Sequence, residues 1–110
     1  MVLIDESIAL LERTPRVVRE LLDGLPESWL SEPDTPNGWT ARDVVGHLIT
    51  GERTDWMPRA EIILRDGTSR AFDRFDRFAM LERDKGVPLD ALIDQFTGCA
   101  QRASPACASW

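Results

Sequence analysis

Apolar residues recur at steps of three and four along the first 25 residues of the chain. This spacing is that of one face of an amphipathic helix, and it is made by Ile4, Ile8, Leu11, Val18, Leu22 and Leu25. Pro15 falls inside the pattern, where its ring removes one backbone hydrogen bond and crowds the carbonyl four residues back. Because the apolar phase continues across the proline, we expect one kinked helix rather than two helices. Gly24 and Pro26 predict where this helix ends.

The following segment, residues 26–39, has neither a helical nor a strand period. It holds three prolines and one glycine, so we expect a loop. Within it, residues 35–38 have the composition of a tight turn.

The residues around position 40 predict the start of a second helix. Thr40 and Asp43 have the spacing of a capping box, and Trp39 and Val44 have the spacing of a hydrophobic staple. These signals predict a helix that begins at Ala41. We expect it to run to about residue 65, to be irregular at its internal proline, and to bury a stripe made by Val44, Leu48 and Ile62.

Three polar residues interrupt the expected apolar stripe. Glu52, Asp55 and Arg59 project into the same sector midway along the helix. One interpretation is an ion pair between Asp55 and Arg59, four residues apart, with Glu52 at its edge. The other is a polar pocket with a functional role.

A repeated Asp-Arg-Phe triplet occupies residues 70–82 and places Phe72, Phe75 and Phe78 at every third position. This pattern predicts a short helix or helical turn whose aromatic rings pack in the core. Aromatic residues between arginines can also form a stacking platform for nucleic acids, but Asp73 and Asp76 cancel the charge that such a platform needs.

The last predicted helix begins at Pro88 and carries Leu89, Leu92, Ile93 and Phe96. After Phe96 the chain has no large aliphatic residue. We therefore expect a helical bundle over residues 1–96 and an atypical tail over residues 97–110.

Composition excludes several classes of protein. With 110 residues, 43% of them hydrophobic, the chain forms one domain. Its net charge of −6 disfavours binding to a phosphate backbone, so we expect no nucleic-acid partner. The chain has no apolar stretch long enough to span a membrane, and Asp5 and Glu6 stand where a signal peptide would be basic, so we expect a cytoplasmic protein without a membrane partner. Cys99 and Cys107 are too few for a disulfide framework, so we expect thiols.

His47 is the only histidine. A lone histidine on a mostly apolar helix face is usually structural. A metal site needs about three converging ligands, and neither a histidine nor a cysteine lies three or four residues from His47.

The residues around His47 nevertheless resemble a known family. The run Gly-Trp-Thr-Ala-Arg-Asp-Val-Val-Gly-His-Leu-Ile at residues 38–49, followed by residues 51–59, is similar to the DinB-like (DinB/YfiT) family of metal-dependent bacterial proteins. Residues 11–15 and 75–79 are similar to one branch of that family, so the resemblance covers roughly residues 3–96.

The resemblance implies an all-α, antiparallel four-helix bundle. In this family a histidine of the second helix joins a His-x-x-x-His pair of the last helix to bind a divalent metal, commonly zinc or nickel, and His47 matches the first of these ligands. Some relatives use the metal to activate a low-molecular-weight thiol for transfer or isomerisation chemistry.

This chain departs from the family pattern because the paired histidines, and the helix that carries them, are absent from its sequence. The change of composition after Phe96 resembles a reading-frame change or a truncated gene. An incomplete bundle exposes apolar side chains of its first two helices, so we expect a homo-oligomer.

Two functions are consistent with these residues. The first is a DinB-like, metal-binding protein related to thiol-dependent transferases and isomerases, with an incomplete metal site at His47 and a substrate cleft lined by Glu52, Asp55 and Arg59. The second is a non-catalytic helical interaction or remnant domain that self-associates. The sequence names no activity and does not establish whether the chain is an enzyme.

Overall fold

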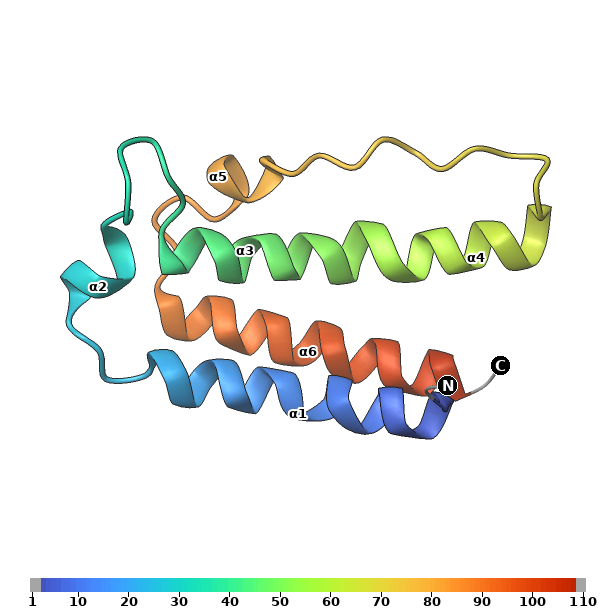
Figure 1. Ribbon diagram of the computed structural model, residues 1–110, viewed down its shortest axis with the longest axis horizontal. Coiled ribbons are helices and arrows are strands. Elements are labelled where there is room, and N and C mark those ends of the chain that lie inside the picture. The colour runs from blue at the N-terminus through green and yellow to red at the C-terminus, as the bar shows by residue number, and fades with distance from the viewer. Residues whose placement is uncertain (1–2, 109–110) are drawn as a thin grey trace.

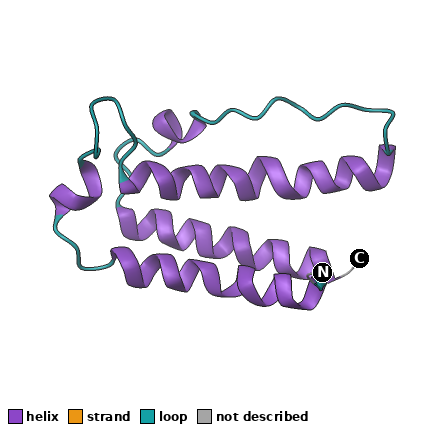
Figure 2. Ribbon diagram, in the orientation of Figure 1, coloured by secondary structure: helices purple, strands orange, loops and turns teal. Residues whose placement is uncertain are grey.

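Three long helical rods make up the protein in the computed structural model, which describes the backbone of residues 3–108 and the side chains of residues 3–101. The first rod is α1 (Ile4–Leu22). The second is continuous through α3 (Ala41–Gly51), the π-helical turn η1 (Glu52–Trp56) and α4 (Met57–Asp66), and the third is α6 (Leu89–Ala108). Two short helices, α2 (Glu27–Ser31) and α5 (Ala79–Arg83), lie in the connections. Figure 2 shows helices and loops and no strand over the described residues, which confirms the all-α class.

The third rod, α6, packs against both of the others (Figure 1). α1 runs antiparallel to it, whereas the second rod and α6 run in the same direction. The parallel arrangement arises because residues 67–78 carry the chain back along the second rod before α6 begins. An antiparallel bundle was expected, and α1 is antiparallel to both other rods. The second rod and α6, however, are parallel to each other. None of the helices in the described part of the chain combines the length and apolar character needed to cross a bilayer.

The first connection differs in one respect from its prediction. α1 continues as a single helix through the buried Pro15, and the chain leaves it at Gly24, where φ is +78°. Residues 26–39 contain the short helix α2, which buries Leu30 and was not predicted. The tight turn is present, since the backbone N–H of Gly38 donates to the carbonyl of Thr35 at 2.9 Å.

The second rod begins as predicted but buries a different face. Thr40 Oγ1 accepts from the backbone N–H of Asp43 at 3.1 Å, and the Asp43 carboxylate accepts from the backbone N–H of Thr40 at 2.9 Å. Val44, however, is 46% exposed, while Val45 and Ile49 are buried. The predicted stripe was therefore wrong by one residue at this end.

The π-helical turn explains part of that error. It contains an extra residue per turn relative to an α-helix, so residues before and after it do not share a single 100° wheel. The turn precedes Pro58, which has no N–H to donate to the helix and lies in the first turn of α4. The rod ends at Gly67, with φ of +58°.

The core lies between α3 and α6 and continues toward α1. Its buried members are Val45, Ile49, Leu92, Ile93, Phe96 and Cys99. α6 passes through Phe96 without interruption, so the expected division at residue 96 does not coincide with the end of an element. Cys99 is a buried thiol in this core; the side chain of Cys107 lies outside the described residues.

The short helix α5 is fastened to α3 by a hydrogen-bonded clamp. The Arg83 guanidinium donates to the Gly46 carbonyl and to Thr50 Oγ1, both at 2.8 Å, and to both carboxylate oxygens of Asp84 at 2.7 Å. The hydrogen bond to Asp84, together with the charge of that carboxylate, raises the pKa of Arg83. A Cβ atom on Gly46 would lie 2.4 Å from Asp84 Oδ2 and 2.7 Å from Met80 Cβ. The glycine thus permits α5 to lie directly on α3.

Candidate functional site

An extended segment, residues 67–78, covers one side of the second rod; we call it the strap. The prediction of a helix or helical turn over residues 70–82 was wrong for most of this range, because regular helix is confined to residues 79–83. A three-residue repeat also matches the three residues per turn of an extended polyproline-type chain. The period of the Asp-Arg-Phe triplets therefore does not distinguish the two conformations.

Each phenylalanine of the strap has one partner on or beside the second rod. The Arg59 guanidinium carbon lies 5.1 Å from the centroid of the Phe72 ring. The Phe75 and His47 ring centroids are 5.6 Å apart, with the planes inclined at 78°. The Phe78 and Trp39 centroids are 6.3 Å apart, at 85°.

These rings do not form a core, contrary to the prediction. Phe72 is 45% exposed and Phe78 is 52% exposed, whereas Phe75 is only partly exposed. The three side chains instead attach the strap to the outside of the second rod.

His47 lies beneath the strap and away from α6. It follows Val45 by two residues, which places it about 200° around the helix from that core residue. Trp39 also contacts the imidazole, with ring centroids 4.9 Å apart and planes inclined at 53°. The Trp39 side chain, expected to pack on Val44, is thus part of the surroundings of His47. Nδ1 of His47 is buried and has no hydrogen-bond partner among the described residues.

The surroundings of His47 do not by themselves fit a metal ion. An orphaned, buried ring nitrogen is a possible ligand, but a zinc or nickel site needs about three such donors. No group of three or more His, Cys, Asp or Glu residues within the described part of the chain could hold a metal. The described residues around this imidazole therefore do not complete a site.

The three polar residues of the second rod occupy the π-helical turn and the start of α4. Arg59 Nε lies 2.7 Å from Asp55 Oδ1, which confirms the expected ion pair, although that buried oxygen lacks hydrogen-bond geometry. Glu52 is half-buried, and burial raises its pKa. No described contact joins these residues directly to His47. The strap spans both places, because Phe72 lies on Arg59 and Phe75 lies on His47.

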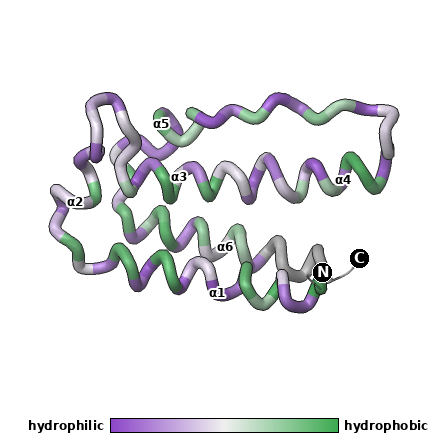
Figure 3. Tube along the Cα trace, in the orientation of Figure 1, coloured by the Kyte–Doolittle hydropathy of each residue, from purple (hydrophilic) through white to green (hydrophobic). Residues whose placement is uncertain are grey.

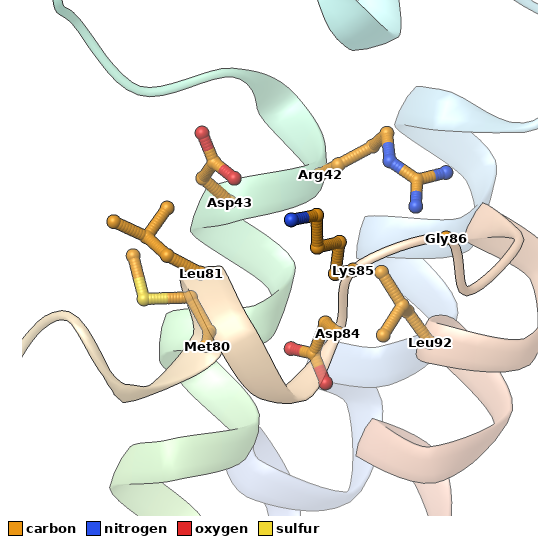
Figure 4. Close-up of a pocket in the computed structure, with 8 residues that line it drawn as sticks. All are labelled: Arg42, Asp43, Met80, Leu81, Asp84, Lys85, Gly86 and Leu92. Carbon is orange, nitrogen blue, oxygen red and sulfur yellow. The ribbon is translucent and has the colours of Figure 1, made fainter.

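A separate cavity that sequence reasoning missed lies between α3 and the segment that follows α5. Its volume is about 140 Å³, and Figure 4 shows Arg42, Asp43, Asp84 and Lys85 around it. The charges of two cationic and two anionic side chains cancel there. Arg42 also donates a hydrogen bond to the Val87 carbonyl. None of the residues predicted for the site lines this cavity.

Comparison with known proteins agrees with this architecture. The family model of the DinB superfamily matches residues 10–109. No curated protein matches the chain. Among solved structures, the chain is similar to YfiT from Bacillus subtilis, with a TM-score of 0.82 and 24% sequence identity over 97% of this chain. That protein is described as a probable metal-dependent hydrolase with an unusual four-helix bundle topology.

The likeness to YfiT establishes a shared fold. This chain covers 61% of the length of the YfiT chain. The family model spans nearly all of the sequence, including the Trp39 to His47 region and the strap. The chain therefore belongs to the DinB superfamily.

Proposed function

We propose that this protein is a DinB-superfamily domain in which His47 occupies the position of one ligand of a divalent-metal site, for zinc or nickel, that the described residues do not complete. Membership of the superfamily and the description of YfiT as a probable metal-dependent hydrolase support the assignment of a metal. The observation that carries the proposal is the state of His47. Its Nδ1 is buried without a partner, while its neighbours are aromatic rather than metal-binding.

An incomplete site limits the chemistry of the chain. A divalent metal, when bound, lowers the pKa of a coordinated thiol or water. A single imidazole does not hold such an ion firmly. We therefore expect the chain alone to show no metal-dependent transferase, isomerase or hydrolase activity and to leave a low-molecular-weight thiol unchanged.

In this proposal Glu52, Asp55 and Arg59 line the wall of the former substrate cleft. The π-helical turn that carries two of them is a feature often found at functional sites. Burial raises the pKa of Glu52, and one carboxylate oxygen of Asp55 is buried without a hydrogen-bond partner, so both carboxylates are partly withdrawn from solvent.

Metal analysis tests the proposal. Purified wild-type protein, His47→Ala and the exposed-site control Glu61→Ala are each dialysed against zinc or nickel and then against buffer. We expect far less than one metal per chain in all three proteins, with the least in His47→Ala. Equal residual metal in wild type and His47→Ala would contradict the assignment of His47 as a ligand. One metal per chain in the wild type and in Glu61→Ala, lost in His47→Ala, would show that the site is complete and would contradict the proposal.

A second function, self-association of a non-catalytic helical domain, is favoured by a specific surface of α1. Leu3, Leu10, Val17 and Leu21 are each more than half exposed. With Ser7 and Thr14 they advance by steps of four and three residues, which is the spacing of a coiled-coil seam. Figure 3 shows apolar positions recurring along this helix. Monomers rarely expose several large apolar side chains along one face, so we propose that a second copy of this chain covers this surface.

A further inference from the structure

Beyond its first three residues, the strap contacts the second rod by side chains alone. Its described hydrogen bonds are local: Ser69 donates from N and Oγ to the Asp66 carbonyl at 3.0 and 2.6 Å, and Phe78 N donates to Asp76 Oδ1 at 3.0 Å. Within residues 3–101, no hydrogen bond joins residues 70–78 to α3, η1 or α4. An extended segment without backbone pairing belongs to the least stable parts of a fold.

The two ends of the strap are held more firmly than its middle. At one end Gly67 has φ of +58°, a conformation that glycine adopts without strain. At the other end α5 is held on α3 by the Arg83 clamp. Residues between these two points can therefore move while both rods stay in place.

The middle of the strap covers the His47 imidazole. The Phe75 and His47 rings form a T-shaped pair with centroids 5.6 Å apart, and Nδ1 is buried. From this arrangement we infer that the strap is a lid: it opens locally, between Gly67 and α5, and uncovers His47 without unfolding the bundle. The inference concerns access to the imidazole and holds whether or not a metal binds there.

Chemical modification of the imidazole measures this opening. His47 is the only histidine, so the ultraviolet absorbance of N-carbethoxyhistidine, formed with diethylpyrocarbonate, reports on one group. We expect wild-type protein to react more slowly than N-acetylhistidine. Removing the Phe75 ring should raise the modification rate about three- to tenfold. This is the rate ratio that corresponds to the interaction free energy of one aromatic pair.

The control is Phe72→Ala. It removes another ring of the same repeat, but this ring lies on Arg59 and not on His47. We expect this variant to raise the rate less than Phe75→Ala. Far-UV circular dichroism melting establishes that each variant folds, and Phe75→Leu, which keeps apolar volume without a ring, is used if Phe75→Ala does not melt cooperatively.

Low concentrations of urea separate local opening from global unfolding, because only global unfolding exposes enough surface to depend steeply on urea. A lid predicts a modification rate nearly independent of urea below the unfolding transition, and trypsin cleavage after Arg74 that accelerates in Phe75→Ala. A rate equal to that of N-acetylhistidine in the wild type would overturn the inference, as would equal rates in wild type, Phe75→Ala and Phe75→Leu.

Discussion

The Phe75 and His47 rings form a T-shaped pair, with 5.6 Å between the centroids and 78° between the planes. The two residues come from the strap and from α3, and they meet on the side of α3 opposite to the core. This relationship means that the residue we propose as one metal ligand is covered by an aromatic side chain of its own chain.

The capping box at the start of α3 positions the helix that carries His47. Thr40→Ala removes the acceptor for the Asp43 N–H. We expect the free energy of unfolding to fall by about 1 kcal/mol, measured by urea denaturation. Thr68→Ala, in the exposed strap, is the control and should change stability little. Equal stability of the two variants would show that the cap is dispensable.

The contact of α5 with Gly46 anchors one end of the strap. Gly46→Ala places a methyl group against Asp84 and Met80, and we expect a loss of about 1–3 kcal/mol of stability. Gly51→Ala is the matched control in the same helix, where a Cβ would meet only Trp56 at 3.4 Å. It should be neutral or stabilising, because alanine has the higher helix propensity. A stable Gly46→Ala protein would contradict the close packing.

Glu52 makes stability depend on pH in a defined direction. Burial raises its pKa above 4.5 in the folded state, so folding favours the protonated form. The contribution of protonated Glu52 to the free energy of unfolding is fully present below the pKa of the unfolded chain. It is lost as the pH rises through the pKa of the folded protein. Glu52→Gln should therefore be more stable than wild type at neutral pH, by about 0.5 kcal/mol or less after solvent screening.

The difference between Glu52→Gln and wild type should disappear below pH 4.5, the ordinary pKa of the side chain. Chemical denaturation across pH measures it, with Glu61→Gln on the exposed face of α4 as the control. A Glu52→Gln protein that is less stable than wild type at neutral pH would indicate that the carboxylate makes a favourable interaction when charged.

Self-association should depend on the exposed stripe of α1. We expect wild-type protein to sediment as a dimer or larger species at high concentration, and Leu10→Glu/Val17→Glu to sediment as a monomer with an unchanged circular dichroism spectrum. Val44→Glu changes an exposed apolar residue on a different rod and should leave association intact. A monomeric wild-type protein at every concentration would rule out this role for α1.

The features that sequence alone predicted are those fixed by neighbouring residues. The capping box, the end of α1 just before Gly24, and the Asp55–Arg59 pair all depend on groups within four residues of one another. Local chemistry is sufficient for each of them, whatever the rest of the chain does.

The features that were not predicted depend on distant parts of the chain. Whether Val44 or Val45 is buried is decided by the approach of α6, and the conformation of the strap is decided by contacts with Arg59, His47 and Trp39. The aromatic cover of His47 could not be read from spacing, because Phe75 lies 28 residues further along the chain.

The claim that the described residues leave His47 as a solitary, covered imidazole is tested most directly by nuclear magnetic resonance of its ring nitrogens. Uniformly ¹⁵N-labelled protein has one histidine, so its imidazole signals are assigned without ambiguity. We predict that one equivalent of zinc leaves these signals in place. A shift of one ring nitrogen to a metal-bound position, complete at one equivalent, would contradict the account.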